Sequence, residues 1–337
     1  MSATPANKQV TLAAPFKGMV AESNFAVVPT DYPVLAENEV LVKTESISVD
    51  PYLRGALASA PVGTVLANYI IGTVVESKSA LFAVGDVVTG IAEQKLYVAV
   101  PADKLRKVDL SLGLRKSLYV GALGMPGQTA YGVIKQGGFK AGDVVVVSGA
   151  AGAVGSLFGQ LARVYGAKKV IGTAGGKDKC AKVVADYGFD ACIDYKEHTT
   201  KETMQEALKA ALGDDKPSFY VDNTGGHVTA ALWDLYDRHA RISVLGAIAE
   251  YNNEKPAQVE SFLFHLIYRA LTVKGFLVFD YVAQPGALDE FYATVPKLIA
   301  DGKVKVDETV LEGIDKVPEA FVGLFKGTNT GKMVINV

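Results

Sequence analysis

The chain has 337 residues, of which 49% are hydrophobic and 21% are charged, a composition typical of a globular protein of about two domains. Its 34 Lys and Arg against 36 Asp and Glu give a net charge of −2, which argues against a nucleic-acid binder or a polybasic membrane anchor. The two cysteines, Cys180 and Cys192, and four histidines without metal-ligand spacing predict no metal site and no disulfide scaffold. The first ten residues lack a signal-peptide pattern, so we expect a cytoplasmic protein.

The chain up to about residue 125 has the patterns of β-strands. Alternating apolar and polar residues predict strands at 39–46, 69–76 and 86–90, with a Gly85-Asp86 turn before the third. Helical periodicity is confined to the stretch around residues 112–123.

After Gly142 short apolar runs alternate with helical segments. We expect strands at 144–147, 169–172, 191–194, 218–222, 240–245 and 272–279. We expect helices at 153–165, 178–187, 201–212, 228–236 and 259–270. This alternation predicts βαβ units and a doubly wound parallel sheet of the Rossmann type. The last strand, 332–337, needs a sheet to join, and we expect it to return to the first domain.

The clearest local motif is Gly149-Ala-Ala-Gly-Ala-Val-Gly155, which stands between an apolar strand and a helix. Residues without a Cβ allow a tight turn, and a pyrophosphate can then approach the backbone N–H groups at the start of the helix. The uncharged stretch 144–162 has nearly the length of a membrane span, but its glycines favour strand, turn and helix instead. We therefore expect a dinucleotide site and no membrane segment.

The end of the second expected strand indicates which dinucleotide is used. An NAD site usually has an acidic residue there, whereas this chain has Gly175 and Gly176 followed by Lys177 and Lys179. A lysine provides the counter-charge for a 2′-phosphate. The sequence therefore predicts NADPH over NADH.

Seven segments of the chain carry a resemblance to a known family. They are Asp50-Pro-Tyr-Leu-Arg54, Gly124-Met-Pro-Gly-Gln-Thr-Ala-Tyr131, the glycine turn, Asp222-Asn-Thr-Gly-Gly226, Gly246-Ala-Ile-Ala-Glu-Tyr-Asn252, Gly275-Phe-Leu-Val278 and Asn329-Thr-Gly-Lys332. Together they resemble the zinc-independent branch of the medium-chain dehydrogenase/reductase superfamily. Within it, the chain is most similar to the leukotriene B4 12-hydroxydehydrogenase/prostaglandin reductase group, with the plant alkenal and bacterial curcumin reductases.

The resemblance implies a two-domain α/β fold and a set of site residues. A β-rich, GroES-like, partly open barrel formed by residues 1–125 and 305–337 would carry the substrate, and residues 126–304 would bind NADP. Substrate-pocket tyrosines of the plant enzymes match Tyr52 and Tyr69. Family cofactor contacts match Met125, Pro126, Thr129, Gly152, Ala153, Val154, Gly155, Lys179, Tyr195, Asn223, Tyr251, Phe276, Leu277, Val278 and Asn329. The family also implies a homodimer, with the strand at 272–279 as the expected interface.

The implied reaction is NADPH-dependent reduction of the C=C bond of α,β-unsaturated aldehydes and ketones. Hydride addition at the β-carbon builds negative charge on the carbonyl oxygen, where a hydrogen-bond donor stabilises the transition state. Tyr251 matches the tyrosine proposed as that donor, or it binds the cofactor ribose while the ribose hydroxyl or water serves the substrate. The alternatives are carbonyl reduction, oxidation of an allylic alcohol, quinone reduction and non-catalytic NADPH binding.

Overall fold

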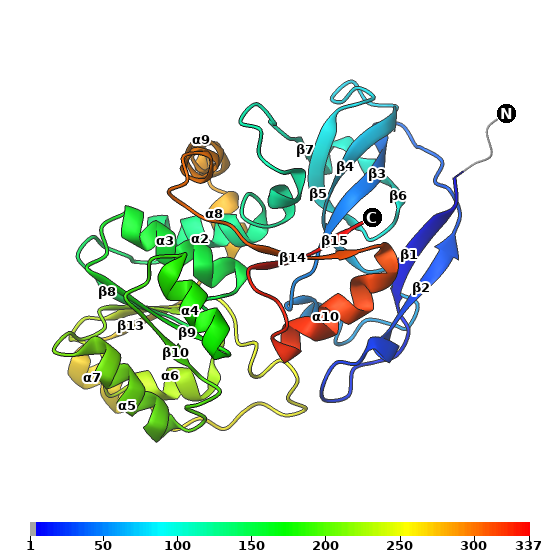
Figure 1. The fold of residues 1–337 in the computed structure, drawn as a ribbon. Coiled ribbons are helices and arrows are strands. Elements are labelled where there is room, and N and C mark those ends of the chain that lie inside the picture. Colours follow the sequence, from blue (N-terminus) through cyan, green and yellow to red (C-terminus); the bar gives the residue numbers. More distant parts are fainter. Residues whose placement is uncertain (1–4) are drawn as a thin grey trace. The chain divides into compact units, whose positions relative to one another are not determined.

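The computed structural model describes residues 5–337. The first four residues, part of the N-terminal segment in which no signal peptide is expected, lie outside the described residues. The chain divides into two compact units, Met1–Met125 with Glu308–Val337, and Pro126–Asp307. Figure 1 labels elements of both units.

The unit Pro126–Asp307 is built on a six-stranded parallel sheet. Its strands are β8 (Val144–Val147), β9 (Lys169–Ala174), β10 (Ala191–Asp194), β11 (Phe219–Asp222), β12 (Arg241–Val244) and β13 (Thr272–Gly275). Their spatial order is β10-β9-β8-β11-β12-β13, with every pair parallel. In chain order this is 3-2-1-4-5-6, the arrangement of a dinucleotide-binding fold, so the predicted doubly wound sheet is confirmed.

Helices cover both faces of this sheet, as Figure 1 shows. They are α2 (Met125–Gln136), α3 (Ala153–Val164), α4 (Lys177–Ala185), α5 (Lys201–Leu212), α6 (Gly226–Leu232), α7 (Leu263–Arg269), α8 (Val278–Val282) and α9 (Ala287–Ala300). Met204 and Leu208 of α5 pack with alternate residues of β8 and β11 in one buried cluster. On the opposite face Phe158 of α3 packs on Phe219 with a centroid distance of 5.9 Å. The four valines of β8 are all buried, as expected for a central parallel strand.

Several predicted elements are shorter than expected, three of them by four residues or more. The helix expected at 259–270 begins only at Leu263, and the preceding Phe262 stacks on Trp233 with ring centroids 4.6 Å apart. The strand expected at 272–279 ends at Gly275, and its apolar continuation starts α8 at Val278, since an apolar run fits either element. The helical stretch 112–123 shrinks to a 3₁₀ turn at Lys116–Val120, between Gly113 and Gly121.

The other unit is rich in strands. Its larger sheet has the order β14-β15-β3-β4-β5-β7, with β6 paired to β3, and β1 pairs with β2 in a second sheet. The strands are β1 (Asn7–Leu12), β2 (Phe25–Thr30), β3 (Glu39–Ser48), β4 (Ala67–Ser77), β5 (Val87–Glu93), β6 (Tyr97–Pro101), β7 (Leu105–Lys107), β14 (Glu308–Glu312) and β15 (Lys332–Asn336). Val334 of β15 pairs with Ser48 of β3, so the final strand joins the N-terminal sheet as expected.

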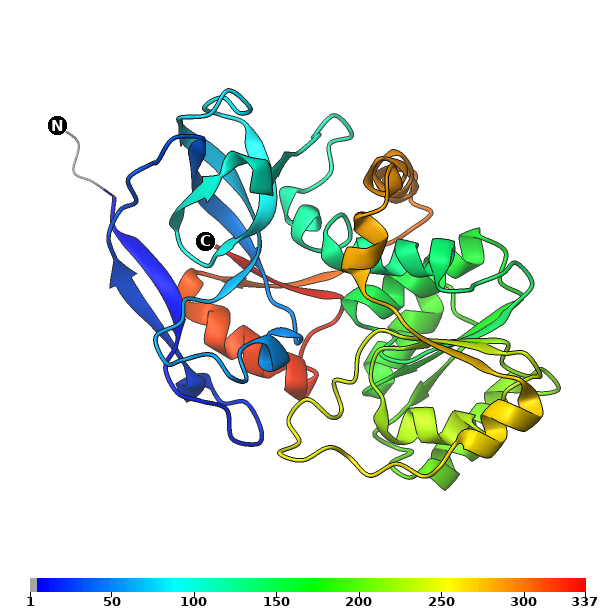
Figure 2. The same cartoon turned by 180° about the vertical axis from the view of Figure 1, so that it is seen from behind.

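Two short helices complete this β-rich unit. They are α1 (Leu53–Ala56) and α10 (Val317–Lys326). Phe321 of α10 meets Phe25 edge to face, with centroids 5.1 Å apart, and both belong to the unit's buried core. Both ribbon views show α10 lying beside the β1–β2 ribbon (Figures 1 and 2).

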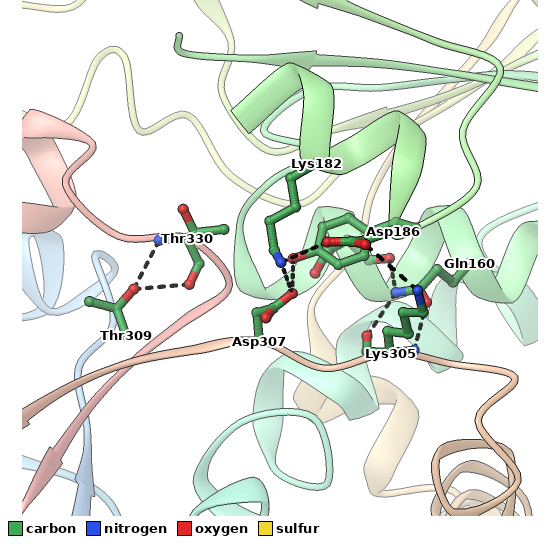
Figure 3. A network of polar contacts seen from close by, with 9 residues as sticks. Gln160, Lys182, Asp186, Lys305, Asp307, Thr309 and Thr330 are labelled. Atoms are coloured by element: carbon green, nitrogen blue, oxygen red, sulfur yellow. Dashed lines mark hydrogen bonds and ion pairs between the residues drawn. The ribbon is translucent and has the colours of Figure 1, made fainter. Parts of the chain in front are cut away.

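Polar contacts hold the segment that follows α9 (Figure 3). The Gln160 amide of α3 donates to the Lys305 carbonyl at 2.9 Å and accepts from the Lys305 N–H at 2.7 Å. The Lys182 ammonium of α4 pairs with Asp186 at 2.8 Å and with Asp307 at 3.1 Å. These contacts attach residues 305–307 to the helices of the parallel-sheet unit.

Among residues 5–337, no helix is both long and apolar enough to cross a membrane. The uncharged stretch 144–162 divides into β8, the glycine turn and most of α3.

Candidate cofactor and active site

The glycine turn connects β8 to the start of α3. Gly149 has φ +64°, which favours glycine, and Gly152 is the residue before the helix. A Cβ at Gly155 would lie 2.4 Å from the Gly149 carbonyl oxygen, so the turn packs too closely for any side chain there. Ala153 and Val154 form the first helical turn, whose N–H groups have no intrahelical acceptor. This cradle fits the pyrophosphate of a dinucleotide.

A buried carboxylate shapes the neighbouring loop after β11. Asp222 accepts hydrogen bonds from the Thr224 and Gly225 N–H groups at 3.0 and 2.8 Å, and from the Thr229 hydroxyl at 2.7 Å. The next residue, Asn223, donates from its amide to the Ser148 carbonyl at 2.7 Å. Asp222 therefore holds Asn223 beside the glycine turn, a role that sequence reasoning missed.

Basic and aromatic side chains gather at the ends of β9 and β10. A Cβ at Gly175 would lie 2.6 Å from the Tyr195 hydroxyl oxygen and 3.1 Å from Lys196 Cε, so both side chains lie over the glycine backbone. The Asp194 carboxylate accepts from the Gly176 N–H at 2.8 Å and the Lys196 N–H at 3.0 Å. These bonds fix the loop that leads into Lys179.

The two lysines of this loop differ in their surroundings. Lys177 is exposed and pairs with Glu197 at 3.0 Å. Lys179 is half-buried, and its burial, followed by the nearby Lys196 ammonium, lowers its pKa. Two ammonium groups close enough to repel each other suit a doubly charged phosphate. Sequence reasoning missed Lys196, although its position two residues after the end of β10 could have indicated it.

Tyr251 lies in the loop after β12. Its hydroxyl oxygen accepts a hydrogen bond from the Ala247 N–H at 3.3 Å. A Cβ at Gly246 would lie 3.2 Å from that oxygen and 3.1 Å from the Asn223 carbonyl oxygen. The structure therefore brings Tyr251 and the Asn223 loop together around Gly246. Accepting this bond leaves the hydroxyl's own proton available for donation.

The remaining predicted contacts of the parallel-sheet unit lie at two element starts. Pro126 and Thr129 are buried in the first turns of α2, which begins at Met125. Phe276 packs on α2, where a Cβ at Gly132 would lie 2.8 Å from its ring. The next two side chains face different surroundings, since Leu277 is 57% exposed and Val278 is 7% exposed.

In the β-rich unit, the predicted pocket tyrosines stand on a polar network. The Tyr52 hydroxyl donates to the Asn68 side-chain oxygen at 2.9 Å, and Asn68 precedes Tyr69 on β4. Burial, then the Asp50 carboxylate, then Tyr69, raise the pKa of Tyr52, so its proton is retained. Tyr52 and Tyr69 are both half-buried and lie in the same part of the unit.

The same network includes a buried ion pair. Asp50 lies 3.4 Å from the Lys332 ammonium, which also donates to the Val49 and Met333 carbonyls at 2.6 Å. The Asn68 amide donates to Asp50 at 3.0 Å. Burial lowers the pKa of Lys332, and the charge of Asp50 opposes that shift. The pair fixes the Asp50–Arg54 loop against β15, a connection that no sequence spacing revealed.

Asn329 stands in the turn before β15. Its amide donates to the Gly331 carbonyl at 2.9 Å. Next to it, the Thr330 N–H donates to the Thr309 hydroxyl oxygen at 2.9 Å, and that hydroxyl donates to the Thr330 carbonyl at 3.0 Å (Figure 3). These bonds hold the turn that carries Asn329 against β14.

Within residues 5–337, no group of three or more His, Cys, Asp or Glu side chains is placed to hold a metal ion.

Known protein families and individual proteins are similar to this chain. A family described as the N-terminal domain of oxidoreductase matches residues 8–108, and one described as zinc-binding dehydrogenase matches residues 153–295. The putative NADP-dependent oxidoreductase YfmJ of Bacillus subtilis (strain 168) is 38% identical, over 99% of this chain and 98% of its own. The NADP(+)-dependent 2-alkenal reductase of Nicotiana tabacum is 36% identical, over 100% and 99%.

Two further relatives extend the comparison to an animal protein and a solved structure. Prostaglandin reductase 1 of Rattus norvegicus is 35% identical, over 97% of this chain and 98% of its own. The crystal structure of CurA from Vibrio vulnificus in complex with NADPH has a TM-score of 0.89 and 33% identity, over 98% of this chain and 99% of that one.

The sheet order, the glycine turn and the lysine-lined loop, together with the two matched families, define a dinucleotide-dependent oxidoreductase. More particularly, the chain belongs to the zinc-independent branch of the medium-chain dehydrogenase/reductase superfamily, in the group of the prostaglandin, alkenal and curcumin reductases. Its cofactor is NADP(H).

Proposed function

We propose that this enzyme reduces the C=C bond of α,β-unsaturated aldehydes and ketones. The observation that carries the proposal is the position of Tyr251, a hydroxyl fixed beside the Asn223 loop of a nucleotide-binding sheet. The names of the prostaglandin, 2-alkenal and curcumin reductases, each at least 30% identical, support the same reaction class. When bound, NADPH supplies the hydride.

The chain's own residues would bind the cofactor and stabilise charge. We propose that Lys179 and Tyr195, with Lys196, hold the 2′-phosphate, and that the turn at Gly152–Gly155 holds the pyrophosphate. Asn223, Asn329, Met125, Pro126, Thr129 and Phe276–Val278 would complete the cofactor site. Tyr52 and Tyr69 would bind the substrate. In this division residues 126–304 would carry most of the cofactor contacts, and residues 1–125 with 305–337 would carry the substrate tyrosines together with Met125 and Asn329.

Tyr251 has two proposed roles, and its hydrogen bonding is compatible with both. The Ala247 N–H donates to the phenol oxygen and polarises the O–H bond, which strengthens Tyr251 as a donor. That donor could meet the carbonyl oxygen of the substrate, where charge develops during hydride addition. In the other role it binds the cofactor ribose, whose hydroxyl or a water then meets the substrate.

A substrate panel tests the proposed reaction. NADPH oxidation is followed with enals, enones, quinones and plain ketones at matched concentrations. We expect turnover with enals and enones and none with plain ketones. Turnover confined to plain ketones or to quinones would replace the proposal with carbonyl or quinone reduction. Tight NADPH binding without turnover on any of them would indicate a non-catalytic binding protein.

We also propose that the protein is a cytoplasmic homodimer. The end strand β13 has only exposed residues and pairs on one side, with β12. The adjoining helix α7 buries none of its residues, and Leu263, Phe264, Ile267 and Tyr268 are each at least 60% exposed. An apolar patch beside an open strand edge is typical of a surface that a second copy covers. Two unbonded cysteines are compatible with a reducing compartment.

A further inference from the structure

The only two cysteines of the sequence lie side by side in the folded chain. Cys180 belongs to the first half of α4 and Cys192 to β10, and the structure holds both as unbonded thiols. The Cys192 thiol donates to Cys180 Sγ, with the two sulfur atoms 2.7 Å apart. A disulfide needs a separation of about 2.05 Å, so only a small side-chain movement is required.

The two thiols differ in solvent exposure and in acidity. Cys180 is buried, at 9% exposure, whereas Cys192 is partly accessible to solvent. The hydrogen bond from Cys192 lowers the pKa of the Cys180 thiol, and the same pairing raises the pKa of Cys192. Cys180 is therefore the more acidic of the two thiols, and the thiolate is the reactive species in thiol oxidation.

The elements that carry the cysteines also carry the basic loop. Cys180 directly follows Lys179, and Cys192 stands two residues before Asp194, whose carboxylate holds the Gly176 and Lys196 N–H groups. A covalent bond between them would tie the first turns of α4 to β10. It would restrict the separation of the two elements that flank the Gly175–Gly176 loop.

We propose that Cys180 and Cys192 are a site of reversible oxidation, at which a small peroxide joins α4 to β10 by a disulfide. The Cys180 thiolate attacks one oxygen of hydrogen peroxide, which breaks the O–O bond and gives a sulfenic acid and water once the released hydroxide takes a proton. Cys192 sulfur then attacks Cys180 Sγ, and its proton leaves with the sulfenic oxygen as a second water. Two thiols are oxidised, and one peroxide is reduced to two waters. The proposal holds whether or not Lys179 binds a 2′-phosphate.

Peptide mass mapping tests the bond directly. The reduced full chain is treated with hydrogen peroxide under native conditions, quenched with an alkylating agent and digested with trypsin without reductant. Cleavage after Lys179, Lys182 and Lys196 separates Cys180 and Cys192 onto the peptides 180–182 and 183–196. We expect a disulfide to link these two peptides, so that the linked pair weighs two hydrogen atoms less than the two reduced peptides together. A thiol reductant should separate them.

Denatured protein and single variants provide the controls. Because folding holds the thiols together, we expect the native chain to form the bond at least about tenfold faster than the chain in urea. In Cys192→Ser the sulfenic acid at Cys180 should persist and react with dimedone, whereas Cys180→Ser should give far less dimedone adduct. The wild-type mapping does not depend on either variant folding.

Hydrogen exchange measures the structural consequence. After oxidation, we expect slower amide exchange in residues 177–185, compared with the reduced chain and with the oxidised Cys192→Ser variant. Two alkylated cysteines after peroxide treatment, links only between separate chains, or equal rates in the native and urea-treated protein would overturn the proposal.

Discussion

At the scale of single residues, Lys179 and Lys177 offer a matched comparison. Lys179 is half-buried beside Lys196, whereas Lys177 is exposed, and its ammonium lies 3.0 Å from Glu197. Loss of a charge-assisted contact to a phosphate costs about 1.5–3 kcal/mol. Lys179→Ala should therefore raise the KM for NADPH about tenfold or more and leave the KM for NADH nearly unchanged. Lys177→Ala should change neither value, and an equal effect of both substitutions would contradict the assignment.

Tyr251→Phe separates the two roles of this hydroxyl. The variant keeps the ring and removes only the oxygen that accepts from Ala247. If Tyr251 donates to the substrate oxygen, kcat on an enone should fall by about tenfold or more, the usual order for loss of such a donor. An unchanged kcat with a higher KM for NADPH would assign the hydroxyl to the ribose. Steady-state kinetics with saturating enone distinguishes the outcomes.

Several site residues could be predicted because a short segment of sequence is enough to indicate their role. The glycines at 149–155 and the lysine at 179 follow strand ends, where a nucleotide fold places its contacts. Asp222 and the Asp50–Lys332 pair could not be predicted in the same way. Their function depends on partners distant in the sequence: Ser148 for the loop of Asp222, and a strand 282 residues further on for Asp50.

At the scale of elements, the glycine turn and α3 must pack without side chains. Gly155→Ala would place a Cβ 2.4 Å from the Gly149 carbonyl oxygen, and neither backbone segment can yield easily. We expect a loss of stability of about 1–3 kcal/mol, as in other overpacked sites, together with weaker NADPH binding. Urea unfolding and NADPH titration measure the two effects.

Gly55→Ala is the control for this substitution. Gly55 lies in α1, and a Cβ there would meet nothing within 4 Å. Its substitution should leave NADPH affinity unchanged. Similar losses in both variants would mean that the contact with the Gly149 carbonyl is unimportant.

Sequence patterns predicted the elements with clear borders well and the stretch 259–279 poorly. The strands at 144–147 and 191–194 and the helix at 201–212 have the predicted bounds, because each is bordered by clear turn or cap residues. Thr200, for example, accepts from the Thr203 N–H at the start of α5. The helix and the strand expected in the stretch 259–279 are shorter in the structure. Apolar residues there are largely exposed, so their pattern does not indicate which residues face the core.

At the scale of the whole molecule, the patch on α7 beside β13 predicts assembly. Leu263 and Ile267 are one helical turn apart and are 60% and 69% exposed. Replacing both with lysine should convert a dimer into a monomer, because burying two unpaired charges opposes association. Light scattering after gel filtration measures the mass. Val34→Lys, at an 89% exposed site elsewhere, should leave a dimer intact. A wild-type monomer would contradict the proposed homodimer.

Deuterium transfer tests whether hydride is delivered to the β-carbon of an enone. NADPH carrying deuterium at C4, on the transferred side, is incubated with an enone, and the product is analysed by NMR. Both deuterium isomers of NADPH are tested, so the result does not depend on which face is used. We predict a saturated ketone with deuterium on the β-carbon. Deuterium on the carbinol carbon of an allylic alcohol would contradict it.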